Sequence, residues 1–469
     1  MSYNKIAKNT SLYTFFSLFS KSINFLLLPL YTNLLTTDEY GIIGLVTALT
    51  AFMSTIYTLS LSGSINRFYI ELVDRPKVLD TFFSTIFITI IINSIFWTIL
   101  ALIFSDFFLV IMPGIDFYPY VFWGLMTVLL RPIYLVYQVI LQSKQEGKKV
   151  ALLDFFLSIV NILITVLLLV VFRQKAEGVL KAQTLSILLI DMIIIIIFLK
   201  KLNWRFNKVL FKKALNYSLP LIPHSLGGMT STMLDRFVIN KYLGVKEAGV
   251  YNIAYQFGNL SNIFTMAFNQ AFTPWFNEQV KMNNNSQIKI VTKLSILLFS
   301  LFAMGVSLFS KEVLELMAKG DFIQGFQYVP FLAFGYAFNG IYFIYSTDLF
   351  YEISGKGLRK LAVITIASAV INLISNILLV PIHGVIGAAF AFILTKMIFA
   401  IITGIVVKKI SRVGVGITNS LCTVLAFFLI SMVALLYFSF VIKMMIYIFI
   451  SSFVLYNPLK TIINSKLSR

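Results

Sequence analysis

Charged side chains interrupt or end several long apolar stretches of the sequence. The basic ones are Lys21, Arg67, Arg131, Arg236 and Lys396, and the acidic ones are Asp154, Asp191, Asp235 and Asp348. Lys21, Arg131, Lys396 and Asp191 lie deep in their stretches, Asp154 and Asp348 lie nearer the cytoplasmic ends, and Arg67 ends the second stretch on the cytoplasmic side. A charge in hydrocarbon is costly, so by default it marks a transport pathway, an ion pair or a water-filled cavity. Lys21, Arg67 and Arg236 make a shared cavity net positive, with Arg131 and Lys396 as further contributors. Such a cavity attracts an anion, and arginine suits phosphate because its planar guanidinium can donate to two oxygens at once.

Each of these charges also has a structural interpretation. Arg131 precedes Pro132, and a proline kink frees backbone carbonyls that an arginine can satisfy. Asp235 and Arg236 are neighbours that point about 100° apart on a helix. They cannot both face one cavity squarely, and a local ion pair is the alternative. For the remaining acids the alternative is an ion pair or a side chain that snorkels to the membrane surface; these are Asp154, Asp191 and Asp348.

A stripe of polar residues lies in the apolar stretch that follows Arg236. Its members recur at i, i+3, i+7, i+10 and i+17, which places them on one face of a helix; they are Asn252, Tyr255, Asn259, Asn262 and Asn269. Amide side chains both donate and accept hydrogen bonds, and a tyrosine ring has an apolar face with a polar tip. The stripe is therefore suited to binding sugars.

Two other apolar stretches share a polar spacing of i, i+4 and i+7. One contains Ser17, Lys21 and Asn24, with Tyr31 further along the same face, and the other contains His224, Gly228 and Ser231, with Asp235 further along. These faces favour a water-accessible cavity, whereas close helix packing through small and hydroxyl residues is the alternative. His224 titrates near neutral pH if unperturbed. With Asp235 and Asp348 it is a candidate for coupling to an ion or proton gradient, although a lone membrane histidine is more often only a hydrogen-bonding residue.

The elements that must position these residues are membrane-spanning helices. The chain has 469 residues, of which 59% are hydrophobic and 12% are charged, against about 25% charged in a typical soluble protein. Fourteen apolar stretches are each about the 20 residues that cross a bilayer as a helix. Approximately, they are 10–35, 41–65, 80–105, 117–142, 150–172, 177–199, 214–240, 248–274, 290–310, 326–350, 359–381, 384–407, 415–438 and 441–459. The sequence therefore predicts an all-α polytopic membrane protein.

The basic residues outside these stretches predict the orientation of the chain. The side of the membrane that carries both termini has 26 Lys and Arg residues in its tails and loops, and the opposite side has 7. This asymmetry places both termini in the cytoplasm. The net charge of +19 is spread over short loops, so we exclude nucleic acid as a partner. The most basic loop, Lys200–Lys213, is expected to lie on anionic lipid headgroups.

The chain repeats itself with an offset of about 208 residues. Thr37–Gly41 corresponds to Val245–Gly249, and Tyr134 and Tyr137 correspond to Tyr342 and Tyr345. A repeat of six helices, an even number, keeps both copies in the same orientation. The predicted organisation is therefore an N-lobe of six helices, a basic cytoplasmic linker, a C-lobe of six helices, and two extra helices with a cytoplasmic tail; these are residues 1–199, 200–213, 214–409 and 410–469.

Motifs for enzyme chemistry are absent from the sequence. It has no phosphate-binding P-loop, no HExxH and no Gly-x-Ser-x-Gly elbow. The single cysteine, Cys422, excludes a disulfide within the chain and a cysteine-rich metal site. We expect a transporter without a cofactor or a metal.

Four short motifs are similar to those of a known family. They are Pro29–Thr32 followed by Tyr40–Gly41, Ser64–Tyr69, Gly249–Tyr255 and Phe272–Phe276. With the topology, they resemble the oligosaccharide flippases, the polysaccharide-export branch of the multidrug/oligosaccharidyl-lipid/polysaccharide superfamily. The likeness covers the first twelve predicted spans in order. It implies two six-helix lobes in a V, like the multidrug-extrusion transporters, in the bacterial cytoplasmic (inner) membrane.

The resemblance also implies a substrate and a mechanism. The family moves undecaprenyl-pyrophosphate-linked oligosaccharides, the units of O-antigen, capsule or related polymers, by alternating access. A polysaccharide polymerase and a chain-length regulator are the implied protein partners, and membrane lipids surround the chain. Related lipid II flippases also have fourteen spans, the last two beside a groove for the lipid tail.

Residue roles follow by combining this resemblance with the charges. Lys21, Arg67 and Arg236 are expected to hold the pyrophosphate, with Arg131 as a further cation, and the asparagine stripe with Tyr255 to bind sugars. Three alternatives stay open. A drug/cation antiporter of the same fold predicts an acidic cavity, a lipid II-type flippase carries a related cargo, and a polymerase or ligase requires a sizeable outer loop.

Overall fold

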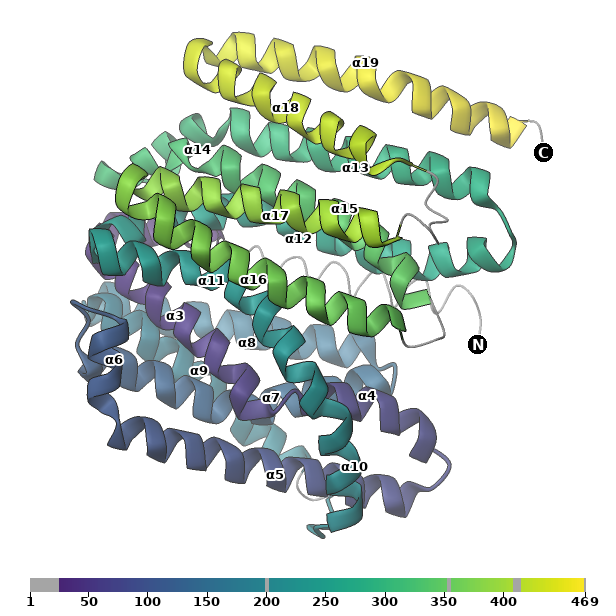
Figure 1. Cartoon of the computed structure of the whole chain (residues 1–469). Coiled ribbons are helices and arrows are strands. Elements are labelled where there is room, and N and C mark those ends of the chain that lie inside the picture. The colour runs from purple at the N-terminus through teal and green to yellow at the C-terminus, as the bar shows by residue number, and fades with distance from the viewer. Residues whose placement is uncertain (1–24, 199–201, 352–355, 408–414, 468–469) are drawn as a thin grey trace. The chain divides into compact units, whose positions relative to one another are not determined.

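The computed structural model describes residues 25–198, 202–351, 356–407 and 415–467, and their regular structure is helical (Figure 1). Within these ranges the side chains of some residues are not described; these are 197–198, 221, 223–224, 228–232, 350–362 and 455–467. Nine of the described helices are long and apolar enough to cross a membrane. The prediction of an all-α polytopic membrane protein is thereby confirmed, while the count of fourteen spans stays a prediction.

The chain divides into two compact units, an N-terminal unit of Met1–Gly249 and a C-terminal unit of Val250–Arg469. The elements up to the boundary are α2 Leu28–Leu34, α3 Thr37–Thr58, α4 Leu61–Leu72, α5 Pro76–Ile103, α6 Ser105–Ile111, the π-helical turn η1 Phe117–Val121, α7 Phe122–Ser143, α8 Gly147–Val166, the π-helical turn η2 Leu167–Val171, α9 Lys175–Phe198, α10 Lys208–Ser218, the 3-10 turn η4 Leu219–Leu221, α11 Ile222–Leu243 and α12 Val245–Lys281, which crosses it. The C-terminal unit continues with α13 Asn285–Leu308, α14 Ser310–Met317, the 3-10 turn η5 Gly320–Gln327, α15 Val329–Tyr351, α16 Lys356–His383, α17 Val385–Val407, α18 Ile417–Tyr437 and α19 Phe440–Leu467.

The second predicted span, 41–65, is broken in the structure. Helix α3 ends at Thr58, and α4 begins at Leu61. Leu59 and Ser60 between them have left-handed backbone angles, with φ of 49° and 50°. Residues other than glycine adopt this conformation at a steric cost, and neither proline nor glycine in the sequence signals the break. It separates α4, which carries Arg67, from the apolar part of the span.

Helix α3 starts with a capping box. The Thr36 side chain accepts a hydrogen bond from the Glu39 backbone N–H, and the Glu39 carboxylate accepts one from the Thr36 backbone N–H, so two otherwise unsatisfied N–H groups are paired. Glu39 also forms an ion pair of 2.8 Å with Lys175 at the start of α9. These contacts fix the beginning of α3.

The beginnings of α3 and α12 touch through two glycines. A Cβ built on Gly41 would collide with the carbonyl oxygen of Val245, and one on Gly249 would collide with the carbonyl oxygen of Thr37. Only residues without a side chain allow backbones this close. Gly41 and Gly249 are the positions that the predicted repeat pairs at an offset of 208, and the structure places them next to each other.

The linker between α9 and α11 is attached to α5. Asn203 accepts a hydrogen bond of 2.9 Å from the Ser84 hydroxyl and donates one of 2.8 Å to the Thr81 hydroxyl. The backbone N–H of Asn207 donates to the Thr85 hydroxyl at 3.1 Å. The Asn207 side chain then caps α10 by accepting from the N–H groups of residues 209 and 210. Helix α10 packs against α4 and α5.

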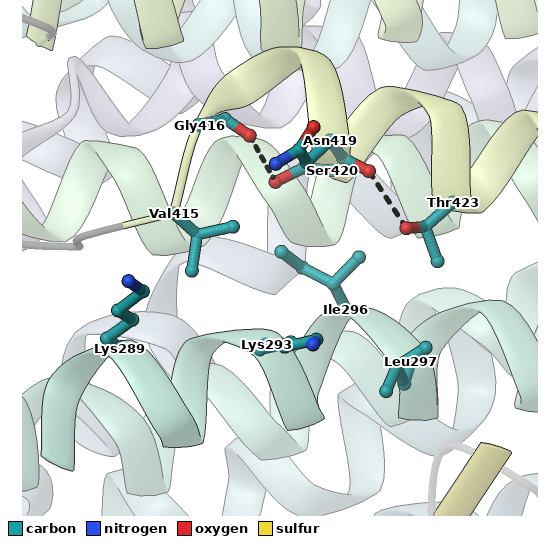
Figure 2. A pocket seen from close by; sticks show the side chains of 9 residues that line it. All are labelled: Lys289, Lys293, Ile296, Leu297, Val415, Gly416, Asn419, Ser420 and Thr423. Carbon is teal, nitrogen blue, oxygen red and sulfur yellow. Dashed lines mark hydrogen bonds between the residues drawn. The ribbon is translucent and has the colours of Figure 1, made fainter. Parts of the chain in front are cut away.

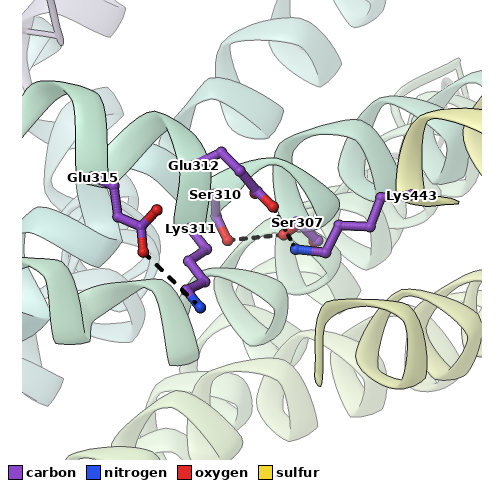
Figure 3. Close-up of polar contacts among 6 residues, drawn as sticks. All are labelled: Ser307, Ser310, Lys311, Glu312, Glu315 and Lys443. Atoms are coloured by element: carbon purple, nitrogen blue, oxygen red, sulfur yellow. Dashed lines mark hydrogen bonds and ion pairs between the residues drawn. The ribbon is translucent and has the colours of Figure 1, made fainter. Parts of the chain in front are cut away.

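A buried ion pair ties α19 to α14 in the C-terminal unit. The ammonium of Lys443, whose side chain is 2% exposed, lies 2.7 Å from a carboxylate oxygen of Glu312 (Figure 3). Helices α18 and α19 both pack against α13, and in Figure 1 they run alongside it at the C-terminal end of the colour scale. The last two helices are thus joined to the C-terminal unit by packing and by charge.

Candidate functional site

Several of the predicted site residues lie outside the part of the chain that the structure describes. Lys21 is in 1–24, as are Ser17 and Asn24 of the same predicted face. His224 is in α11, but its side chain is outside the described set. Their proposed roles stay predictions.

Two arginines of the N-terminal unit are exposed. Arg131 lies near the middle of the membrane-spanning segment Phe117–Ser143, and Arg67 lies on α4, which packs against α7. Neither guanidinium makes a hydrogen bond or an ion pair with a residue that the structure describes. A cation at this depth of a membrane is stable only beside water or a partner. The roles predicted for Arg131 and Arg67 stay predictions.

Asp235 and Arg236 of α11 are both buried, at 0% and 5% exposure. Helix α11 packs against α3, and the charge of Arg236 acts on the Tyr40 hydroxyl near the start of that helix. The side chains of this adjacent pair are enclosed by protein, so neither lies on a surface that a ligand reaches in this conformation. Their predicted roles in substrate binding and ion coupling stay predictions.

The asparagine stripe lies on α12, within the C-terminal unit. Asn252 is buried at 3% exposure, and the other members are half-buried. Asn262 donates a hydrogen bond of 2.9 Å to Asn259, so these two amides are brought together and each satisfies part of the other. The Tyr255 ring meets the Tyr336 ring edge to face, with centroids 6.2 Å apart. Within the stripe, Asn259 and Asn262 are thus joined directly, and the one bond between them leaves part of the hydrogen-bonding capacity of both amides unused.

Asp348 and Lys396 are both buried in the C-terminal unit. Asp348 on α15 is 1% exposed, and Lys396 on α17 is 4% exposed. The Lys396 ammonium lies 5.5 Å from the centroid of the Phe392 ring, a cation–π contact. Helices α15 and α17 pack against each other.

A buried polar cluster in the N-terminal unit accounts for Asp154. The Tyr134 hydroxyl and the Gln138 amide both donate to one oxygen of Asp154, the amide at 2.7 Å. This arrangement supports the structural interpretation of Asp154. Asp191 on α9 differs, because it is 1% exposed and neither of its carboxylate oxygens has a hydrogen-bond partner in the described ranges.

The structure adds a buried polar group that sequence reasoning did not select. Asn372 on α16 is 0% exposed, and neither amide atom of its side chain has a hydrogen-bond partner among the described residues. Thr395 on α17, a helix that packs against α16, has a buried hydroxyl in the same state. Unpaired buried polar groups are costly. The sequence signal for this buried polar group is the pair Asn372 and Asn376, which lie one helical turn apart in an apolar stretch.

An apolar cavity of about 400 Å³ lies in the N-terminal unit between α3, α5 and α6. Its walls include Phe52, Met53, Trp97, Leu100, Phe104 and Phe107. Since no charged side chain lines it, this cavity suits a hydrocarbon chain and not an anionic group.

Known proteins match the chain in sequence and in fold. The family model described as polysaccharide biosynthesis protein matches residues 6–280, and the model MatE matches residues 220–378. A protein of Haloferax volcanii named as a probable low-salt glycan biosynthesis flippase, Agl15, is 27% identical over 212 residues, 44% of this chain and 44% of that protein. Lsg locus protein 1 of Haemophilus influenzae is 22% identical over 410 residues, 82% of this chain and 95% of that protein.

The fold is that of a solved flippase. The structure of the lipid II flippase MurJ in an inward closed conformation superposes with a TM-score of 0.74 at 15% identity. The superposition covers 97% of this chain and 99% of that chain, α18 and α19 included.

Proposed function

We propose, from the premise that the chain belongs to the polysaccharide biosynthesis protein family, that it flips a polyprenyl-pyrophosphate-linked oligosaccharide across a membrane. The family and the fold are those of transporters and flippases, not of enzymes. In the proposed cycle no covalent bond changes. The pyrophosphate and sugars cross on the protein while the polyprenyl chain stays in lipid, and alternating access driven by an ion or proton gradient gives direction.

The position of Arg131 within a spanning segment is the observation that carries this proposal. The residue is exposed near the middle of a spanning segment, and its guanidinium makes no hydrogen bond or ion pair with a described residue. A lipid-facing position would be costly, which supports a water-filled path along this face of α7. Arg67 on the neighbouring helix α4 adds a second cation in the same state. Arg67 lies near the Ser143 end of α7, because its neighbour Asn66 accepts a hydrogen bond from Ser143, about 18 Å along the helix from Arg131. The two arginines would therefore bind phosphate oxygens of the cargo at different points of its path.

The sugar part of the proposed cargo fits α12. Asn259 and Asn262 are half-buried and joined by a hydrogen bond, so they combine a fixed position with hydrogen-bonding capacity that this one bond leaves over, and the half-buried Tyr255 ring lies on the same face of α12. Uncharged glycans are bound by such side chains, since each amide donates and accepts. Agl15, the relative named as a glycan biosynthesis flippase, supports a glycan as the cargo class.

Replacing Arg67 and Arg131 together with alanine is expected to abolish flipping. Each arginine contributes a charge-assisted bond, so each single replacement should lower the rate by about 10- to 100-fold. The measurement reconstitutes the protein in liposomes and follows the fraction of a fluorescent lipid-linked oligosaccharide that a membrane-impermeant reagent reaches. Arg205→Ala, an exposed arginine in the linker, is the control and should flip at the wild-type rate.

Two results would refute the proposal. One is an unchanged rate in the Arg67→Ala, Arg131→Ala double variant that is present in the membrane at the normal level. The other is faster transport of an organic cation than of the lipid-linked glycan, which would favour the drug/cation antiporter. Lipid II as a parallel substrate separates the two flippase cargoes, because both carry pyrophosphate and differ only in the head group.

A further inference from the structure

A cavity of about 250 Å³ opens between the beginnings of α13 and α18 in the C-terminal unit. Figure 2 shows side chains of α13 along one wall and the start of α18 along the other. Lys289 and Lys293 lie one helical turn apart on α13, and Asn419 and Thr423 have the same spacing on α18. None of the described residues that line the cavity is acidic; the others are Ile296, Leu297, Val415, Gly416 and Ser420.

Both lysines carry a charge that no residue described by the structure neutralises. Lys289 and Lys293 are exposed, and neither makes a hydrogen bond or an ion pair within the described part of the chain. Side chains four residues apart are neighbours on a helix, and like charges at this spacing repel. An anion between the two ammonium groups and the opposite wall would relieve this repulsion.

The α18 wall offers hydrogen-bond donors to such an anion. The Asn419 amide has no hydrogen-bond partner in the described ranges. A Cβ on Gly416 would meet nothing within 4 Å, so the space above the backbone at the start of α18 is open. The Val415 carbonyl accepts a hydrogen bond of 2.6 Å from the Tyr345 hydroxyl, which fixes this wall in place. The cavity is thus a defined concave site.

The cavity combines a charged mouth with an apolar wall. Lys289 is the fifth residue of the 24-residue helix α13, and Gly416 immediately precedes α18, so the mouth lies where the helices begin. The starts of spanning helices lie at the depth of lipid headgroups. Ile296 and Leu297, further along α13, line the apolar part. A ligand that fits both parts has an anionic head and a hydrocarbon tail.

We infer that this cavity binds the phosphate headgroup of an anionic phospholipid of the surrounding membrane. The ammonium groups of Lys289 and Lys293 and the Asn419 amide hold the phosphate oxygens, and an acyl chain follows Ile296 and Leu297. Basic pockets between helices at a membrane face are suited to anionic headgroups. The bound lipid joins α13 to α18 and is not cargo, so the inference holds or fails independently of the proposed flipping.

Phosphatidylglycerol is the probe for the test. Native mass spectrometry of the full chain in detergent counts the bound lipid, and titration gives its Kd. The double replacement of Lys289→Gln and Lys293→Gln should raise the Kd on the order of 30-fold, because each lysine near an anionic headgroup contributes about 1 kcal/mol of attraction. Lys281→Gln with Lys319→Gln removes two exposed lysines that do not line the cavity, and this control should bind as the wild type does.

A second variant keeps both charges. Gly416→Val fills the open space at the start of α18, where the backbone has ordinary extended angles, and should also weaken binding. Phosphatidylcholine and inorganic phosphate are the comparison ligands, and both should bind at least tenfold more weakly than phosphatidylglycerol. Equal binding of inorganic phosphate would overturn the lipid assignment, and wild-type affinity in both variants would overturn the site.

Discussion

Replacing Gly249 with valine is expected to slow transport strongly while leaving the protein in the membrane. The starts of α3 and α12 meet backbone to backbone at Gly41 and Gly249, and any Cβ there collides with a carbonyl oxygen of the other helix. A backbone atom cannot move aside as a flexible side chain can. The two helix starts must therefore separate, and the arrangement in which they touch becomes less populated. If the proposed cycle passes through this arrangement, flipping slows by the same factor.

The expected size follows from the cost of overpacking. Inserting a side chain into a tightly packed site costs about 1–3 kcal/mol, which disfavours the touching arrangement by about 5- to 150-fold. Gly41→Val should act in the same way because the contact is reciprocal. The liposome flipping assay measures the loss. Arg205→Ala, an exposed residue of the linker, is the control and should retain the wild-type rate.

A distance measurement separates this explanation from simple misfolding. Asp38 and Lys246 are exposed residues at the starts of the two helices, and Cys422 is the sole native cysteine. Spin labels on Asp38→Cys and Lys246→Cys in a Cys422→Ser background report the separation. The Gly249→Val variant should lose the population with the short distance. An unchanged distance distribution together with normal flipping would rule out a role for the contact.

Glu312→Gln is expected to lower the stability of the C-terminal unit. It leaves the ammonium of Lys443, which is 2% exposed, without its partner at 2.7 Å (Figure 3). Removing one member of a buried ion pair costs about 3–5 kcal/mol. Because the Glu312 side chain is 26% exposed, we expect the lower end of that range. The midpoint of thermal unfolding in detergent is the measurement.

Two further variants make this test specific. Lys443→Met with Glu312→Leu removes both charges and should recover most of the lost stability, since apolar pairs of similar volume replace buried ion pairs well. Lys311→Gln breaks the pair of 3.9 Å between Lys311 and Glu315, whose side chains are 45% and 50% exposed, and should change stability by about 0–1 kcal/mol. Equal losses in Glu312→Gln and Lys311→Gln would contradict the assignment of a buried pair.

Much of the fold could be predicted from the apolar stretches. The predicted spans 384–407 and 415–438 agree with α17 at Val385–Val407 and α18 at Ile417–Tyr437, because a continuous apolar run bounded by polar residues leaves few alternatives. The break at Leu59 and Ser60 could not be predicted, since both residues are ordinary in a helix and the surrounding packing imposes their backbone angles.

The candidate site was only partly predictable for the same reason. Sequence spacing places Asn259 and Asn262 on one face, and the structure joins them by a hydrogen bond. Spacing along one helix carries no information on what the neighbouring helices cover. It could not reveal that Asp235 and Arg236 are both enclosed, or that Arg131 is exposed. The sequence pairs Gly41 with Gly249 as equivalent positions of the repeat. Their contact depends on how α3 and α12 pack, which the repeat alone does not reveal.

The attachment of the linker to α5 matters for anyone who fuses a reporter to this protein. Residues 202–213 are rich in basic side chains and lie between predicted spans, so they look like the natural place to insert a fluorescent or epitope tag that maps which side a loop faces. Asn203 and Asn207 are instead bonded to Thr81, Ser84 and Thr85. A tag inserted there would disrupt the packing of α10 against α4 and α5, so its signal would come from a perturbed protein. The exposed turn at Met282–Asn283, between α12 and α13, is the insertion point that leaves these bonds intact.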